Sequence, residues 1–143
     1  MTIEMSFREK SAWISFVSIL LVFGAYFWNV ARVLGGRVGQ DAAYGISIGL
    51  LIAFVLLEIV LHIAVAIQAP DEARAPRDER ERLIEMRATR VAFQVLVVGA
   101  LAGVGTLHVT RSAWVMSQVV LLAVVVAELV KFGGQIFYFR RGV

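Results

Sequence analysis

The sequence predicts an all-α fold, a four-helix transmembrane bundle with both termini in the cytoplasm. Three observations support this prediction. The 143 residues are 59% hydrophobic, whereas ordinary soluble domains are about 45–50% apolar. The apolar residues gather in four runs, each long enough to cross a bilayer as a helix. Lysine and arginine flank these runs unequally, which sets an orientation in the membrane.

Each run is interpreted as one span, and residues 1–143 as a single transmembrane domain. A polar stretch separates the second run from the third and is expected to form a charged cytoplasmic loop. A short connection within each pair of spans suggests two hairpins, which would form a 2+2 pseudo-repeat. The expected spans are residues 11–33, 43–67, 91–107 and 113–139, and the loop is residues 68–90.

The first span carries a stripe of polar and small residues. Its steps of three and four residues place the stripe on one helix face. That face should point at other helices, because an amide facing lipid would leave its hydrogen-bonding groups unpaired. The stripe comprises Ser15, Ser18, Val22, Ala25, Asn29 and Arg32.

Glycines mark a turn and two packing motifs. Gly35, Gly36 and Gly39 follow the first span, where backbone freedom favours a tight reversal. Two pairs of glycines spaced four residues apart would let helices approach closely. These helix-packing candidates are Gly45 and Gly49 in the second span and Gly99 and Gly103 in the third.

The distribution of basic residues predicts the orientation. Ten lysines and arginines lie in the N-terminal lead, the central loop and the C-terminal tail, against three (Arg32, Arg37 and Arg111) on the other side. The side richer in basic residues is normally cytoplasmic. We therefore expect cytoplasmic termini and location in a bacterial inner membrane.

Two carboxylic acids lie inside apolar runs. Glu58 and Glu128 each occupy a Val-x-x-Glu-x-Val segment, at similar expected depth. A lone charge there costs roughly 2.5–3.5 kcal/mol on insertion scales. His62 follows Glu58 by four residues and Lys131 follows Glu128 by three. One interpretation is a protonatable or ligand-binding site where these four residues converge; the other is a set of satisfied pairs that determine helix packing.

The charged loop also has two interpretations. Pro70 and Pro76 bracket the break after the second span, and Asp78 then suits an N-cap with acids in the first turn. We expect a juxtamembrane helix that continues into the third span. It either docks a cytoplasmic partner or is a solvated connector that sets topology. The candidate docking residues are Asp78, Glu79, Arg80 and Arg82.

Several classes of function are not expected. The chain has no cysteine, which excludes disulfides, Cys-ligated zinc, iron–sulfur clusters and thiol catalysis. His62 and His108 belong to opposite halves of the membrane, so paired haem ligation and a metal site are not expected. No catalytic motif is present, so the protein is not expected to be an enzyme or to need a cofactor. The net charge of +3 lies at membrane edges, which does not indicate nucleic-acid binding.

Four short segments resemble uncharacterised small bacterial membrane proteins with four helices. They are Glu9-Lys10-Ser11-Ala12-Trp13, Asp78-Glu79-Arg80, and Ala127-Glu128-Leu129-Val130-Lys131 with Tyr138-Phe139-Arg140-Arg141-Gly142. The resemblance implies an accessory or regulatory membrane protein, and some such proteins are associated with helix-turn-helix regulators. Small multidrug transporters differ, because their essential glutamate lies in the first helix.

The leading prediction is a non-enzymatic structural or regulatory subunit that binds a protein partner, or a second copy of itself, in or at the lipid bilayer. The alternative is a dimeric, proton-coupled carrier of small solutes that uses Glu58 and Glu128. A third possibility is a membrane enzyme or a pigment- or ligand-binding subunit.

Overall fold

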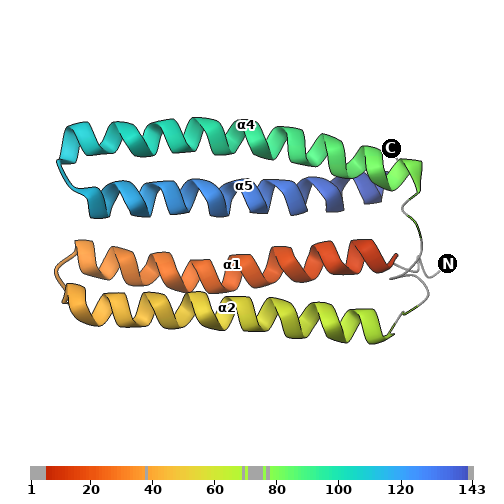
Figure 1. The fold of residues 1–143 in the computed structure, drawn as a ribbon, viewed down its shortest axis with the longest axis horizontal. Coiled ribbons are helices and arrows are strands. Elements are labelled where there is room, and N and C mark those ends of the chain that lie inside the picture. Colours follow the sequence, from red (N-terminus) through yellow and green to blue (C-terminus); the bar gives the residue numbers. More distant parts are fainter. Residues whose placement is uncertain (1–5, 38, 69, 71–75, 77, 142–143) are drawn as a thin grey trace. The chain divides into compact units, whose positions relative to one another are not determined.

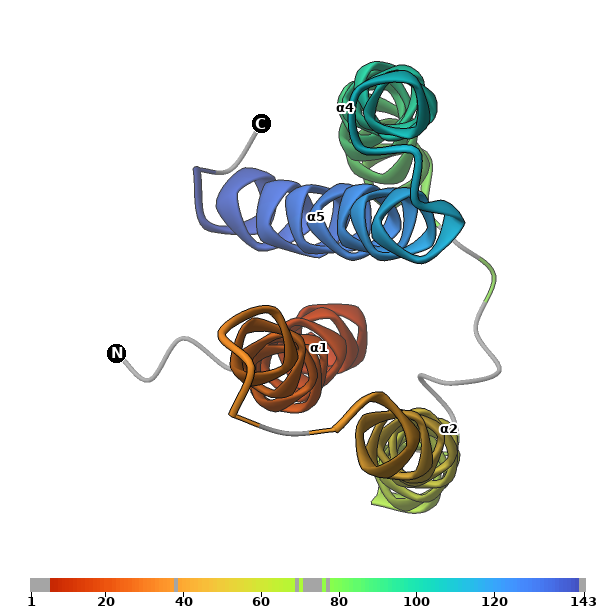
Figure 2. The same cartoon turned by 90° about the vertical axis from the view of Figure 1, so that its left-hand side faces the viewer.

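The computed structural model describes residues 6–37, 39–68, 70, 76 and 78–141. Four long helices make up nearly all of this described part, which contains no strand. The chain divides into two compact units, Met1–Ala75 and Pro76–Val143. Each unit is an antiparallel helical hairpin (Figures 1 and 2). The helices are α1 (Phe7–Leu34), α2 (Gln40–Gln68), α4 (Glu79–Thr110) and α5 (Ala113–Arg141).

Local chemistry explains where α1 begins and ends. The Ser6 side chain caps its N-terminus, with Oγ accepting the Glu9 N–H at 3.2 Å. At the other end Gly35 is the C-cap, and Gly36 has a φ of +68°, a conformation that glycine adopts at little cost. The predicted tight reversal is therefore confirmed at Gly36. The connection is short, because α2 begins at Gln40.

The polar stretch before the third span is helical from Glu79 onwards. Asp78 and Glu81 form a capping box, in which each side chain satisfies a backbone N–H of the first turn. The helix then runs without a break to Thr110, which confirms the predicted juxtamembrane helix that continues into the span. It ends at Arg111, whose φ of 55° is left-handed, and Ser112 Oγ accepts the Val115 N–H at the start of α5.

The first unit is held together by aromatic and polar contacts between α1 and α2. The rings of Phe23 and Phe54 meet edge to face with centroids 5.1 Å apart. Two turns earlier in α1, Ser15 reaches Glu58 and His62. The predicted inward-facing polar stripe is confirmed by burial of Ser15, Ser18 and Asn29. It is wrong at two positions, since Ala25 and Arg32 are exposed.

The second unit has a seam of small residues between α4 and α5. A Cβ added at Gly99 would lie 2.5 Å from Ala123 Cβ, and one at Gly103 would lie 2.5 Å from Val120 Cγ2. A Cβ at Gly134 would lie 3.3 Å from Ala88 Cβ. The two backbones therefore approach closely along most of the hairpin, as small residues allow in membrane helices.

The paired glycines of α2, in the first unit, have no close neighbours. A Cβ added at Gly45 or Gly49 meets no atom within 4 Å. These two glycines thus lie away from the contacts between α1 and α2, and their role in helix packing stays a prediction.

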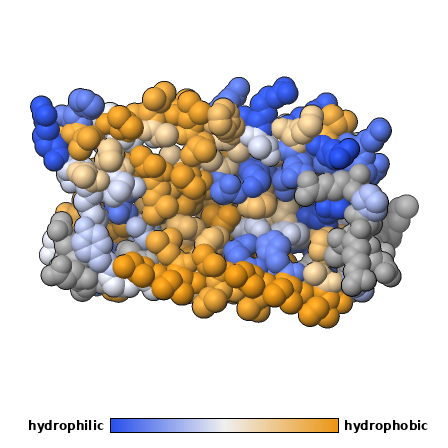
Figure 3. Space-filling model, in the orientation of Figure 1, coloured by the Kyte–Doolittle hydropathy of each residue, from blue (hydrophilic) through white to orange (hydrophobic). Residues whose placement is uncertain are grey.

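The exposed surface of the helices is apolar enough to require lipid. On α2, Leu56 is 58% exposed and Val60 is 62% exposed, and their neighbours continue this apolar surface over most of the helix (Figure 3). Soluble monomers rarely expose apolar patches of this extent. All four helices are long and apolar enough to cross a membrane. The protein is therefore an integral membrane protein, and the predicted all-α, four-helix fold is confirmed.

Candidate functional site

Glu58 lies at the centre of a polar cluster between α1 and α2. The Ser15 hydroxyl donates to Glu58 Oε2 at 3.1 Å. On the next turn of α2, His62 Nδ1 lies 2.9 Å from the Glu58 backbone oxygen and 3.3 Å from Oε2. The carboxylate is thus contacted both from its own helix and from the neighbouring one.

Ser15 also connects the carboxylate to the far side of the imidazole. Its Oγ lies 3.4 Å from His62 Nε2. When His62 carries both ring protons, Nε2–H donates to Ser15 Oγ while the hydroxyl donates to Glu58 Oε2, because a hydroxyl donates and accepts at once. The three side chains can therefore form a continuous hydrogen-bonded path from imidazole to carboxylate.

Two side chains of the cluster are shielded, whereas the His62 side chain is 43% exposed. The Glu58 side chain is 18% exposed, and Ser15 is 2% exposed. Glu58 Oε1 is buried and has no hydrogen-bond partner among the described residues. An unpartnered buried oxygen is costly, so this geometry leaves a position for a further hydrogen-bond donor at Oε1.

Glu128 is satisfied in a different way, within its own helix. Lys131 Nζ donates to Glu128 Oε2 at 3.0 Å, and both side chains are partly exposed. The ammonium also lies 4.8 Å from the centroid of the Phe132 ring, a cation–π contact. This arrangement fits a local pair that neutralises two charges along one helix.

The sequence anticipated the pairs Glu58–His62 and Glu128–Lys131 from helical spacing, and the structure brings each pair together. Convergence of all four residues stays a prediction, since one pair belongs to each unit. Sequence reasoning did not assign Ser15 to Glu58. The available signal was its place in the polar stripe of α1, but which residue of another helix it meets depends on the hairpin register.

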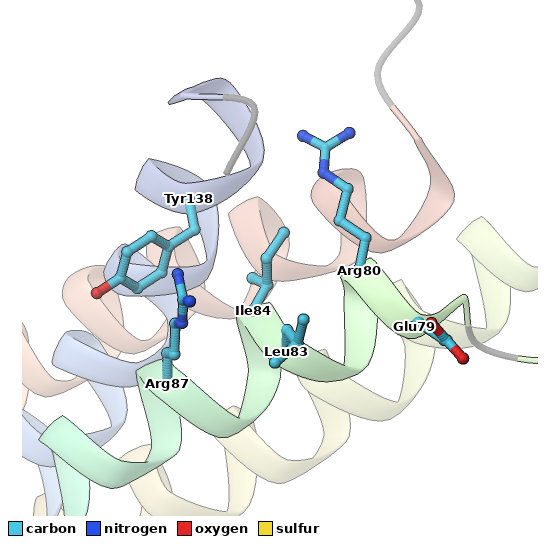
Figure 4. A pocket seen from close by; sticks show the side chains of 6 residues that line it. All are labelled: Glu79, Arg80, Leu83, Ile84, Arg87 and Tyr138. Atoms are coloured by element: carbon cyan, nitrogen blue, oxygen red, sulfur yellow. The ribbon is translucent and has the colours of Figure 1, made fainter.

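A second polar feature lies between α4 and α5 in the second unit. A cavity of about 240 Å³ opens near the beginning of α4. In Figure 4, Arg87 reaches towards Tyr138, and Leu83 and Ile84 lie between Arg87 and Arg80 along α4. The residues that line the cavity are Glu79, Arg80, Leu83, Ile84, Arg87 and Tyr138.

The four candidate docking residues have different surroundings. Asp78 and Glu79 belong to the helix cap, where Asp78 Oδ1 accepts the Glu79 N–H at 2.7 Å. Arg80 and Glu79 line the cavity, whereas Arg82 is exposed and does not. Only Arg82 among these four therefore has neither a capping nor a cavity-lining position.

Among the described residues, no group of three or more His, Asp or Glu side chains could hold a metal ion. His108 Nδ1 lies 3.3 Å from the Val104 backbone oxygen of its own helix. His62 belongs to the Glu58 cluster of the other unit.

Comparisons with known proteins agree with this architecture. Residues 8–143 match a protein family described as "Predicted membrane protein (DUF2178)". Searches of curated proteins and of solved structures found no match. The family description agrees with the four apolar helices and assigns no activity. Because the match extends over nearly the whole chain, this protein belongs to the DUF2178 family of predicted membrane proteins.

Proposed function

We propose that the protein is a non-enzymatic membrane subunit that binds a protein partner through the polar end of α4. The observation that supports this proposal is the regular helical structure of the segment before Val91. It is a capped, continuous extension of a spanning helix, whereas a connector that only sets topology needs no such structure. A rigid extension can present side chains to a partner at a constant distance from the membrane.

The proposed docking face consists of Arg82, Met86 and Arg90. Steps of four residues place them on one side of α4, and all three are exposed. Met86 is 59% exposed in a segment otherwise rich in charge. An exposed flexible thioether between arginines is typical of protein-binding surfaces, where Met and Arg are enriched. The excess of basic residues on this side supports a cytoplasmic location in a bacterial inner membrane.

The test is native mass spectrometry of the full chain, purified in mild detergent from its own membrane. We expect a defined additional protein mass, and its loss in the double variant Arg82→Glu, Met86→Asp. The matched control is Val109→Asp, Arg111→Glu, which alters an exposed apolar residue and an arginine at the other end of α4. A wild-type chain free of any partner, or equal loss in both variants, would contradict the proposal.

A second candidate function, proton-coupled transport of a small solute, is favoured by the Glu58 cluster. A path of hydrogen bonds from His62 through Ser15 to Glu58 is suited to moving a proton. Intramembrane carboxylates commonly serve in proton relays. The unpartnered Oε1 provides a position where a hydrogen-bond donor of the solute would bind.

This candidate is tested in proteoliposomes that contain a pH-sensitive dye. Under an imposed pH gradient, the wild-type chain should conduct protons above the background of empty vesicles, and Glu58→Gln should abolish the flux. Glu79→Gln, which removes a carboxylate at the polar end of α4, serves as the control. Proton flux equal in Glu58→Gln and wild type would exclude the relay.

A further inference from the structure

We propose that the cavity between α4 and α5 binds the phosphate of an anionic phospholipid headgroup, with Arg87 and Tyr138 as the phosphate-binding residues. This inference does not rest on the proposed function, because none of Arg82, Met86 and Arg90 lines the cavity. It concerns the lining residues shown in Figure 4.

The depth of the cavity in the membrane is the first argument. Tyr138 lies between Phe137 and Phe139, just before Arg140 and Arg141. Aromatic residues followed by arginines at a helix end mark the membrane–water interface. Arg87 lies four residues before the apolar run that begins at Val91, or about 6 Å along the helix axis. The headgroup layer is roughly 5–8 Å thick on each side, so Arg87 lies within it.

Charge is the second argument. Arg80 and Arg87 both line the cavity, and neither forms a hydrogen bond or an ion pair with a residue that the structure describes. Glu79 also contributes to the lining, but its carboxylate points away from Leu83 and Ile84 (Figure 4). The lining therefore carries a net positive charge without an internal counter-ion.

Shape and polarity are the third argument. Leu83, which is 49% exposed, provides an apolar surface beside Arg87, where the first methylenes of an acyl chain would lie. The Tyr138 ring lies beside Arg87 (Figure 4), and its hydroxyl is a second hydrogen-bond donor among the lining residues. Guanidinium is well matched to phosphate. Basic pockets between membrane helices at the cytoplasmic surface are suited to anionic lipid headgroups. Arg80 lies about two turns before Arg87 in α4. It would attract the headgroup by its charge without binding the phosphate directly.

The test is lipid titration of the detergent-solubilised full chain, read by native mass spectrometry. The probe is phosphatidylglycerol, compared with phosphatidylcholine bearing the same acyl chains. We expect preferential binding of phosphatidylglycerol and a roughly tenfold weaker affinity in Arg87→Gln, because the substitution removes a charge-assisted hydrogen bond to the phosphate. Tyr138→Phe should weaken binding by a similar factor, because it removes one hydrogen-bond donor.

The matched control is Arg90→Gln. It removes the same charge three residues away and still closer to the apolar run, but Arg90 does not line the cavity. We expect Arg90→Gln to bind phosphatidylglycerol as the wild type does. Equal weakening in Arg87→Gln and Arg90→Gln would show a general surface-charge effect and overturn the proposal. Equal binding of the two lipids would also overturn it.

A final experiment distinguishes binding of a lipid phosphate from binding of a soluble phosphate. Glycerol 3-phosphate at millimolar concentration should neither form an adduct nor displace phosphatidylglycerol, because it lacks the acyl chains that would contact Leu83. Displacement would assign the cavity to a soluble ligand and overturn the lipid proposal. Circular dichroism of each variant verifies its helix content. If Arg87→Gln does not fold, the comparison of Tyr138→Phe with wild type decides the result.

Discussion

At the scale of single residues, Ser15 is the link between the two helices of the first unit. Its hydroxyl reaches the Glu58 carboxylate and lies beside the His62 ring. Such a contact both stabilises the hairpin and holds Glu58 in one orientation. Glu128 does not depend on a hydrogen-bond donor from another helix, because Lys131 in its own helix already donates to it.

We expect Ser15→Ala to destabilise the protein by about 0.6 kcal/mol and at most about 1.7 kcal/mol, the measured range for hydrogen bonds between membrane helices. The loss is measured by reversible unfolding in mixed detergent micelles. Ser18→Ala is the control, because Ser18 is buried on the same helix without a described hydrogen bond. Equal destabilisation by both substitutions would argue that packing, and not the hydrogen bond to Glu58, is responsible.

At the scale of elements, the two hairpins use different means to hold their helices together. The contact between α1 and α2 consists of large aromatic side chains and a polar cluster. The contact between α4 and α5 consists of small residues that bring the backbones close together. The two hairpins therefore share hydropathy and connectivity while their interfaces differ in chemistry.

We expect Gly99→Ala to destabilise the α4–α5 hairpin by about 1–3 kcal/mol, as overpacking does in close-packed interiors. The added Cβ would lie 2.5 Å from Ala123 Cβ, and neither atom can move without shifting a backbone. Gly105→Ala is the control in the same helix, because its Cβ meets nothing within 4 Å. Thermal unfolding in detergent should show a loss for Gly99→Ala and none for Gly105→Ala.

The capping box gives a prediction for the beginning of α4. Asp78→Ala should cost about 1 kcal/mol, the usual contribution of an N-cap side chain, because the first turn would lose its side-chain acceptor. Amide hydrogen exchange of Glu79 to Arg82 should become faster, while exchange near Gly99 stays unchanged. Unaltered exchange in the first turn would mean that the cap does not hold this segment helical.

At the scale of the whole molecule, sidedness decides which surfaces a cytoplasmic partner can reach. The basic residues predict that the N-terminus, the polar end of α4 and the C-terminus share the cytoplasmic side. The chain contains no cysteine, so single cysteines can report accessibility without background.

We expect Arg37→Cys and Ser112→Cys to react with a membrane-impermeant maleimide in intact cells. Ser6→Cys and Thr89→Cys should react only after the membrane is permeabilised, because they lie on the predicted cytoplasmic side. The reversed pattern would contradict the predicted orientation, and with it the cytoplasmic location of the docking face.

The chain's hydropathy and charge were sufficient to predict four membrane helices, their approximate ends and the helical extension before Val91. This is possible because a bilayer requires about 20 apolar residues per span and internal satisfaction of every backbone group, constraints that are local in sequence. Spacing within one helix likewise predicted that Glu58 meets His62 and that Glu128 meets Lys131.

Contacts between helices were decided only by the tertiary structure. The register of each hairpin determines that Ser15 meets Glu58, that Gly99 and Gly103 meet α5 while Gly45 and Gly49 remain open, and that Arg87 lies beside Tyr138. Every apolar helix offers several faces of nearly equal hydropathy, so composition does not select among them. The choice comes from side-chain fit across the hairpin, which joins residues far apart in the sequence.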